Sequence, residues 1–210
     1  MSHLSRVLAL SSSDTGEMRA IYDDWAPTYE KDLADDSQDY VAPAIASTYV
    51  AKSLGAERIS DKVEILDAGC GTGLVGMHLA RLGAKIIDGI DLSQGMLDVA
   101  RKTGVYRSLE TADLSKPLSQ KTDSYDVVSC IGTLTQGHVG PGALDEFVRV
   151  VKGGGVIVAT VLDSIWTEGG YEAKVQGLVT EGKVRLVNSQ REDSRRGAGV
   201  MARMVVLQVL

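Results

Sequence analysis

A glycine-rich turn is the first group of residues in this sequence whose types and spacing suit ligand binding. Three glycines stand at alternate positions in the run Ile65-Leu66-Asp67-Ala68-Gly69-Cys70-Gly71-Thr72-Gly73-Leu74. Glycine lets the backbone pass close to a ligand, and a helix that begins here offers unpaired N–H groups. The segment from Gly71 to Gly76 also fits G-x-G-x-x-G, which alone is weak evidence for a dinucleotide. The alternative is a plain strand-to-helix turn.

Acidic residues around this turn indicate the kind of ligand. Asp67 stands two residues before the first glycine, where its charge would repel a pyrophosphate and attract an ammonium group. Asp91 follows the turn by about 20 residues, at the end of the next predicted strand, where a carboxylate accepts both hydroxyls of a ribose. Asp113, with Leu114, follows the third predicted strand and suits the amino group and a ring nitrogen of adenine. Each acid alone is consistent with a solvated side chain.

Ligands of open α/β sheets bind in the crevice at the carboxyl ends of the strands. The glycine turn, Asp91 and Asp113 fall at three successive strand ends, so they favour one crevice that holds an adenosine and an ammonium group. S-adenosylmethionine carries both. Met96 and Leu97, one turn into the helix after Asp91, either flank the adenine or belong to the core.

The elements that must position these residues alternate between strand and helix patterns. Strands are expected at 63–66, 85–90, 105–110, 125–131 and 156–161, and helices at 74–82, 93–103 and 143–151. Such alternation predicts right-handed crossovers and a parallel sheet. Two further strands, 183–189 and 200–209, are joined only by the polar stretch 190–199 and read as a hairpin. We therefore expect an α/β, Rossmann-like sheet of seven mostly parallel strands, with an antiparallel C-terminal hairpin and helices on both faces.

Composition and charge limit the classes of function that this sequence can have. The chain has 210 residues, 44% hydrophobic and 24% charged, with a net charge of −6 that argues against a broad nucleic-acid-binding face. No apolar run approaches the roughly 20 residues of a membrane span, and the apolar patch at 7–10 is too short for a secretory signal. We expect a cytoplasmic protein with no nucleic-acid or membrane partner and no metal. Its single domain would comprise an N-terminal helical lid, 1–58, with helices at 15–32 and 43–54, and a cofactor-binding core, 59–210.

Several stretches outside the glycine turn carry a family resemblance. They are Tyr22-Asp23-Asp24-Trp25-Ala26-Pro27-Thr28-Tyr29, Tyr40-Val41-Ala42-Pro43, Gly95-Met96-Leu97, and Gly132-Thr133-Leu134 with Gly137-His138-Val139. With the glycine turn, they resemble class I S-adenosylmethionine-dependent methyltransferases. The closest similarity is to the methyltransferase-like proteins named after the Williams–Beuren chromosomal region. A departure is Gly153-Gly154-Gly155, where Pro-Gly-Gly is more usual before the fifth strand.

This resemblance implies that the glycine turn holds the methionine part of the cofactor, that Asp91 binds ribose and that Asp113-Leu114 binds adenine. It also implies that the first aromatic helix closes over the cofactor, although aromatics spaced three and four apart fit a helix packed on the core equally well. The expected cofactor site is Tyr22, Trp25, Tyr29, Asp67, Ala68, Gly69, Cys70, Gly71, Gly73, Leu74, Asp91, Leu92, Met96, Asp113, Leu114 and Cys130. The alternative for Cys70 and Cys130 is that they are small reduced packing residues.

The methyl acceptor is the less determined part of the prediction. His138, in the glycine-rich loop after the fourth strand, is the candidate general base, and a loop histidine without a role is the alternative. Acids of the first helix, such as Asp23, are a second possibility for attracting an amine. Tyr40 and Trp166, together with His138, are candidate substrate-binding residues. The expected function is methyl transfer to an oxygen, nitrogen or carbon atom of a small molecule; the alternative is S-adenosylmethionine binding without transfer. A nicotinamide-dependent reductase is disfavoured because no Tyr-x-x-x-Lys pair is present.

Overall fold

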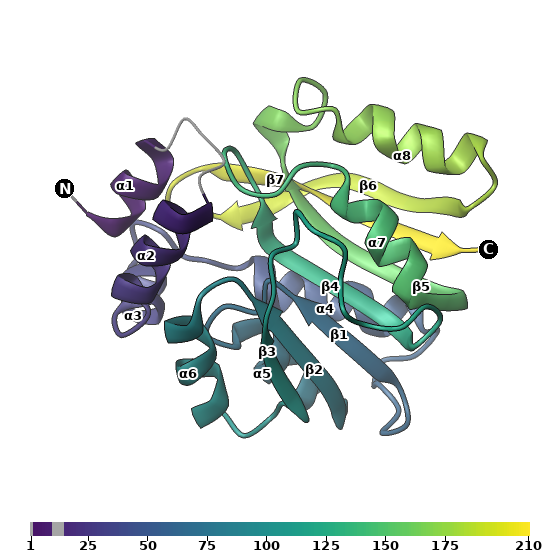
Figure 1. Ribbon diagram of the computed structural model, residues 1–210, viewed down its shortest axis with the longest axis horizontal. Coiled ribbons are helices and arrows are strands. Elements are labelled where there is room, and N and C mark those ends of the chain that lie inside the picture. Colours follow the sequence, from purple (N-terminus) through teal and green to yellow (C-terminus); the bar gives the residue numbers. More distant parts are fainter. Residues whose placement is uncertain (1, 10–14) are drawn as a thin grey trace.

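A computed structural model describes residues 2–9 and 15–210 and contains one seven-stranded sheet (Figure 1). Its strand order is β3-β2-β1-β4-β5-β7-β6. Strands β1 to β5 are parallel, and β7 runs antiparallel to both of its neighbours. The predicted sheet with a C-terminal hairpin is therefore confirmed. The strand bounds are β1 (Glu64–Ala68), β2 (Ile86–Asp91), β3 (Ser108–Thr111), β4 (Tyr125–Leu134), β5 (Val151–Leu162), β6 (Val184–Arg195) and β7 (Val200–Val209).

The strand order reverses beside β1, and this reversal creates the ligand crevice. After β1 the chain adds β2 and β3 on one side, and then crosses to β4 on the other. Asp67 on β1 pairs with Gly89 on β2 and with Ser129 on β4, so the carboxyl ends of these strands lie side by side. Open α/β sheets bind their ligands at such a switch point.

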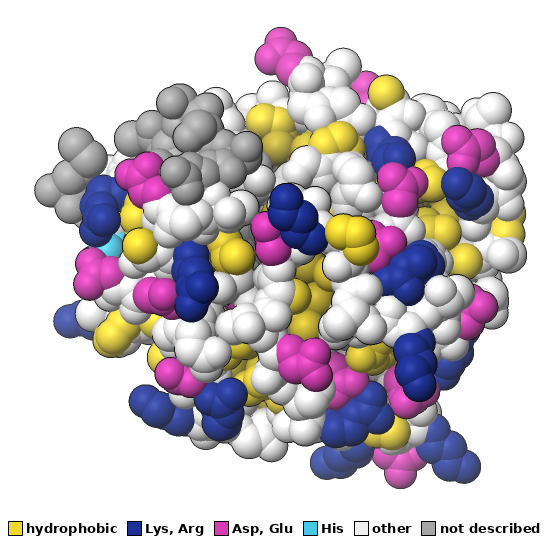
Figure 2. All heavy atoms as spheres, viewed as in Figure 1, with side chains coloured by type: hydrophobic (Ala, Val, Ile, Leu, Met, Phe, Trp, Pro, Cys, Tyr) yellow, Lys and Arg dark blue, Asp and Glu magenta, His cyan; other side chains and the backbone are white. Residues whose placement is uncertain are grey.

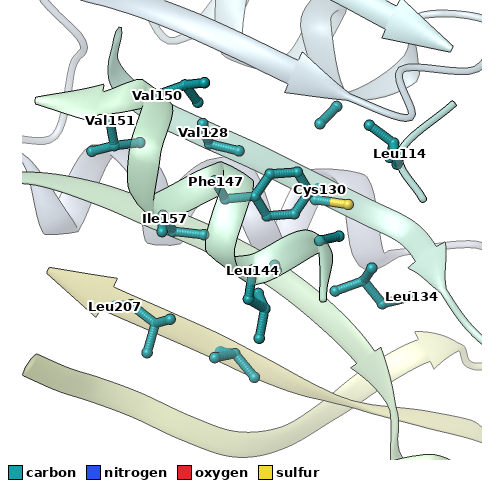
Figure 3. Close-up of a cluster of buried hydrophobic side chains, with 14 of the residues drawn as sticks. Leu114, Val128, Cys130, Leu134, Leu144, Phe147, Val150, Val151, Ile157 and Leu207 are labelled. Atoms are coloured by element: carbon teal, nitrogen blue, oxygen red, sulfur yellow. The ribbon is translucent and has the colours of Figure 1, made fainter. Parts of the chain in front are cut away.

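Helices cover both faces of the sheet (Figure 1). One apolar cluster packs α4 (Ala42–Ser53) and α5 (Leu74–Arg81) against the strands. The other packs α7 (Ala143–Val150) and α8 (Tyr171–Thr180). In Figure 3 the Phe147 ring of α7 lies among side chains of β4 and β5, close to Cys130. Helix α6 (Gln94–Lys102) packs beside β2 and β3.

Three short helices form a separate layer at the N-terminus: α1 (His3–Ala9), α2 (Thr15–Trp25) and α3 (Tyr29–Ala34). The predicted single helix over 15–32 is interrupted after Trp25, because Pro27 lacks an N–H and disfavours helical geometry in the residue before it. The indole of Trp25 donates to Asp32 across this break at 2.8 Å. The layer has its own apolar cluster, which includes Met18, Ile21 and Trp25.

The C-terminal part differs most from the sequence-based expectation. The stretch 190–199 was expected as a loop, but β6 continues to Arg195 and only 196–199 forms the turn. Its polar residues are tolerated because β6 is an edge strand, whose outward side chains meet solvent. Backbone bonds from Val41 to Ser194 and from Arg196 to Asp39 tie this extended strand to the N-terminal layer. Helix α8 and the short 3₁₀ turn Asp163–Ile165 were not predicted.

Within the described residues, no helix combines the length and the apolar character that crossing a bilayer requires. The same residues contain no cluster of His, Cys, Asp and Glu side chains that could hold a metal ion.

Candidate active site

A cavity of about 670 Å³ opens at the carboxyl ends of β1, β2 and β4, next to α2. Ligand cavities in proteins commonly have volumes of about 300–1,000 Å³. The walls of the cavity in this protein come from α2, α3 and the glycine turn, and from the ends of β2 and β4. The loops after β3 and β4 and the segment around the start of α8 complete them. Lining residues are Thr15, Met18, Tyr22, Tyr29, Gly69, Gly71, Asp91, Leu92, Met96, Ala112, Asp113, Leu114, Ser115, Lys116, Ile131, Gly132, Thr133, Thr135, Gln136, Gly137, His138, Val139, Gly140, Pro141, Ile165, Gly169 and Tyr171.

The glycine turn presents its backbone to this cavity. The N–H groups of Gly69 and Cys70 both donate to the Ile90 carbonyl, at 2.8 and 3.0 Å, and so fasten the turn to β2. Gly69 and Gly71 have φ angles of +73° and +54°, which side-chain-bearing residues rarely adopt. A Cβ at Gly69 would collide with Thr133, whereas one at Gly71 would meet no protein atom within 4 Å. Gly71 therefore leaves room for a ligand at the cavity wall.

Asp67 lies beneath the glycine turn and is not among the residues that line the cavity. Its carboxylate accepts the Tyr106 hydroxyl at 2.7 Å and the Ser129 hydroxyl at 2.9 Å. Burial raises the pKa of Asp67 to about 6, although both hydrogen bonds oppose that rise. Asp67 thus supports the turn from below through Tyr106 and Ser129, and its contact with an ammonium group stays a prediction.

Tyr106 is a site residue that sequence reasoning missed. Its ring fills the space beside three glycines: Gly73, Gly76 and Gly89. The signal was indirect, because a half-buried aromatic in the loop before β3 matters only once the turn is folded over it. Ala68, Cys70, Gly73 and Leu74 of the turn also lie outside the cavity lining and hold its frame.

Asp91 faces the cavity from the end of β2. One carboxylate oxygen accepts the Gly71 N–H at 2.8 Å, and the other accepts the Ser93 N–H at 2.9 Å. Burial raises the pKa of Asp91, while these backbone donors oppose the rise. Because each carboxylate oxygen accepts more than one hydrogen bond, Asp91 keeps capacity for two ligand hydroxyls. The chemistry of this fixed acceptor fits a ribose, and Leu92 and Met96 line the wall beside it.

The loop after β3 forms the far end of the cavity. One oxygen of Asp113 accepts the Ser115 N–H at 2.9 Å and the Ser115 hydroxyl. Asp113 and the buried Leu114 both line the cavity, as does Lys116, which the sequence did not single out. This end combines an acid oxygen with an apolar side chain and suits a flat base with an amino group.

His138 and Tyr22 meet at the wall of the same cavity. The Tyr22 hydroxyl lies 3.0 Å from His138 Nε2, and His138 Nδ1 lies 3.0 Å from the Gln136 carbonyl and 2.8 Å from the Thr135 hydroxyl. Because a carbonyl only accepts, Nδ1 carries the ring proton, and Nε2 accepts the Tyr22 hydroxyl. Burial lowers the pKa of His138 and raises that of Tyr22, so both groups are neutral near pH 7. The proton-free Nε2 thus accepts the Tyr22 hydroxyl, and both side chains line the cavity.

Other candidate residues lie outside the cavity lining. Trp25 is buried beneath the two tyrosines, stacked on Tyr22 at 5.9 Å and edge-on to Tyr29 at 4.8 Å between ring centroids. Trp166 is 6% exposed in the core, with the Arg203 guanidinium over its ring. The Tyr40 hydroxyl sits against Gly132, and Cys130 is fully buried beside Phe147. Tyr29, in contrast to these residues, lines the cavity together with Tyr22.

Residues 65–155 match the family model described as a methyltransferase domain. The chain is 35% identical over 148 residues to human methyltransferase-like protein 27. This matched region covers 70% of this chain and 58% of that protein. It is 34% identical over 119 residues to the ubiquinone biosynthesis O-methyltransferase of Alkalilimnicola ehrlichii, covering 55% of this chain and 47% of the relative. The chain thus spans less than two thirds of the length of these relatives.

Solved structures share the fold at lower identity. The putative methyltransferase crystallised with the Trm112 activator of Haloferax volcanii superposes with a TM-score of 0.63 at 16% identity, covering 91% of this chain and 96% of that one. The magnesium protoporphyrin IX methyltransferase of Synechocystis with bound S-adenosylhomocysteine superposes with a TM-score of 0.57 at 17% identity. This superposition covers 79% of this chain and 83% of that one. Residues 65–155 thus match a methyltransferase domain, the chain is similar in sequence to methyltransferase-like protein 27, and its fold is shared with solved methyltransferases.

Proposed function

We propose that this protein transfers the methyl group of S-adenosylmethionine to a hydroxyl oxygen of a small molecule, with His138 accepting the hydroxyl proton. The observation that carries the proposal is the proton-free Nε2 of His138, which faces the cavity that also contains Gly71 and Asp91. A nucleophile that must lose a proton needs a base within hydrogen-bond reach.

The cofactor would lie along the wall from the glycine turn to Asp113. Gly69 and Gly71 let it pass close to the backbone, Asp91 accepts the ribose hydroxyls, and Asp113 meets the adenine amino group. When bound, S-adenosylmethionine supplies a methyl group activated by its positively charged sulfur. The residues contribute by positioning, which is worth about 7–11 kcal/mol for well-oriented reactants.

The polarity of the cavity favours a neutral hydroxyl over an amine acceptor. Its lining carboxylates are Asp91 and Asp113, and the cofactor would engage both of them. An ammonium acceptor would therefore have no carboxylate beside His138, whereas a neutral imidazole suits an O–H donor. The acceptor hydroxyl would take the place at Nε2 that the Tyr22 hydroxyl holds, 3.0 Å from the ring nitrogen.

Two observations support a small acceptor rather than a nucleic acid. The relatives include a ubiquinone biosynthesis O-methyltransferase and a demethylmenaquinone methyltransferase, whose names specify small-molecule pathways. On the face of the molecule drawn in Figure 2, basic side chains are interspersed with acidic ones and form no continuous basic stripe. Binding of a polyanion depends on such a stripe.

The proposal is tested by calorimetric titration with S-adenosylhomocysteine, followed by assay of its release from S-adenosylmethionine with phenolic, amine and carbon-acid acceptors. We expect binding of S-adenosylhomocysteine, none of NAD, and release with phenolic acceptors. Binding without release across all three acceptor classes would instead support a protein that uses the cofactor without methyl transfer. Release only with amines would contradict the role given to His138.

A further inference from the structure

Asp23 of α2 makes a contact with the cofactor-binding core that no other function explains. One of its carboxylate oxygens accepts the Ser93 hydroxyl at 2.6 Å and the Gly95 N–H at 2.9 Å. Ser93 is the N-cap of α6 and lies in the core of the molecule. The N-terminal layer is thus bonded directly to the start of the helix that follows Asp91.

The same Ser93 also holds the proposed ribose acid. Its N–H donates to Asp91 at 2.9 Å, and its hydroxyl oxygen accepts the Met96 N–H at 3.0 Å. Ser93 therefore uses its N–H for Asp91, its O–H for Asp23 and its oxygen lone pair for the first turn of α6. Displacement of Asp23 would leave the Ser93 hydroxyl without this acceptor. Because the Ser93 N–H orients Asp91, the change would reach the proposed ribose acid.

Gly95 permits this close approach of the two helices. A Cβ at Gly95 would lie 2.9 Å from the carbonyl oxygen of Asp23 and 3.0 Å from its Cα, both tighter than side chains tolerate. The φ angle of Gly95 is not in the left-handed region, so the glycine serves proximity rather than a turn. A side chain here would push α2 away from α6.

The charges around this contact are few and can be named. Asp23 and Asp91 repel each other, and the charge of Asp23 contributes to the raised pKa of Asp91. On the solvent side, Arg19 lies 3.7 Å from the second oxygen of Asp23, one helical turn away. The contact therefore combines two short hydrogen bonds with repulsion between two carboxylates. The hydrogen bonds outweigh this repulsion and hold Asp23 in place.

We propose that Asp23 is a positioning residue that couples the docking of α2 over the cavity to the orientation of Asp91. Docked α2 favours the Asp91 geometry that receives the ribose, and by reciprocity a bound cofactor favours docked α2. The inference rests on the cofactor site of the proposed function. It adds that the N-terminal layer and the cofactor stabilise each other through Ser93.

The test compares four variants of the full chain: Asp23→Ala, Asp23→Asn, Gly95→Ala and, as matched control, Asp24→Ala. Asp24 is the neighbouring acid on α2, and within the described part of the chain its hydrogen-bond and ion-pair partners are His3 and Arg6, at the surface. The measurements are calorimetric affinity for S-adenosylhomocysteine and hydrogen exchange of residues 15–25 with and without that ligand. Thermal melts confirm that each variant is folded.

For Asp23→Ala and Gly95→Ala we expect affinity to fall about 5–30-fold and ligand-induced protection of α2 to disappear. Asp23→Asn keeps an acceptor oxygen, so affinity stays within about threefold of wild type; loss of the charge beside Asp91 extends binding to lower pH. Asp24→Ala stays at the wild-type affinity.

Wild-type affinity in Asp23→Ala, with α2 still protected by ligand, would overturn the proposal. So would an Asp24→Ala variant that loses affinity as strongly as Asp23→Ala. Failure of the wild-type protein to bind S-adenosylhomocysteine would instead overturn the proposed function itself, and the two failures are therefore distinguishable.

Discussion

The two ends of the cavity are built in different ways. The end proposed for the cofactor uses backbone groups and carboxylates from one stretch of chain, between Gly69 and Leu114, and Asp91 is fixed there by two backbone N–H groups. The end proposed for the acceptor uses side chains from α2, from the loop after β4 and from the start of α8, and Tyr22 meets His138 across 116 positions. The first end is recognisable largely from local sequence, whereas the second includes Tyr22 of α2 and so depends on the position of the N-terminal layer.

The difference predicts that variants at the two ends affect different steps. The largest effect is expected for His138→Ala. Loss of a general base lowers kcat/KM by about 10²–10⁴-fold, while affinity for S-adenosylhomocysteine stays within about twofold. Steady-state kinetics with a phenolic acceptor, combined with calorimetry, measure both quantities.

His78→Ala is the matched control, because His78 lies on α5 outside the cavity lining. It should leave both quantities unchanged. Full activity of His138→Ala would show that His138 is not the base. Weakened affinity of this variant for S-adenosylhomocysteine would show that His138 also contributes to cofactor binding, so that the two ends do not act separately.

A smaller effect, in the opposite pattern, is expected for Asp91→Ala. This change removes the acceptor for two ribose hydroxyls and leaves the Gly71 and Ser93 N–H groups without their partner. Affinity for S-adenosylhomocysteine should fall by at least about 100-fold, since hydrogen bonds to a charged group are worth about 1.5–3 kcal/mol each and two are lost.

The control for Asp91→Ala is Asp98→Ala, at an exposed carboxylate on α6 that pairs with Arg101. Calorimetry should give the wild-type affinity for this variant. Equal affinities of Asp91→Ala and wild type would mean that the ribose does not lie at the end of β2.

Much of the cofactor end could be predicted because its signals are short-range. The glycine turn, Asp91 and Asp113 each follow a strand, and parallel strands bring their carboxyl ends to one edge. Asp67 shows the limit of this reasoning. Sequence places an acid at the turn, but only packing decides that it faces Tyr106 and Ser129.

The acceptor end could be predicted only in outline. His138 was identifiable as a histidine in the loop after β4, but its partner Tyr22 and the carbonyl that fixes its tautomer are tertiary features. Trp166 illustrates the opposite outcome. An aromatic residue just after β5 suits a substrate pocket, yet its side chain packs inward beneath Arg203.

The pH dependence of catalysis should follow the protonation of His138. Burial lowers the pKa of His138 below its ordinary value of 6.5, and the neutral imidazole is the active base. We therefore expect kcat/KM to hold constant from pH 7 down to about 6.5 and to fall about tenfold per pH unit only below the lowered pKa. An acid limb centred above 6.5 in a pH–rate profile would contradict this placement of His138.

The smallest effect on catalysis is expected for Trp166→Phe. Because the indole is buried in the core, the change should lower the free energy of unfolding by about 1–3 kcal/mol and leave KM for the acceptor within about twofold. Chemical denaturation and steady-state kinetics measure these two effects. A large rise in KM without loss of stability would move Trp166 from the core to the acceptor site.

A crystal structure with S-adenosylhomocysteine would show whether one cavity holds both the cofactor, at Asp91, and the proton acceptor His138. We predict that both ribose hydroxyls bind the Asp91 carboxylate, and that the sulfur faces the end of the cavity formed by Tyr22 and His138. A ribose bound away from Asp91, or a sulfur directed away from His138, would contradict this prediction.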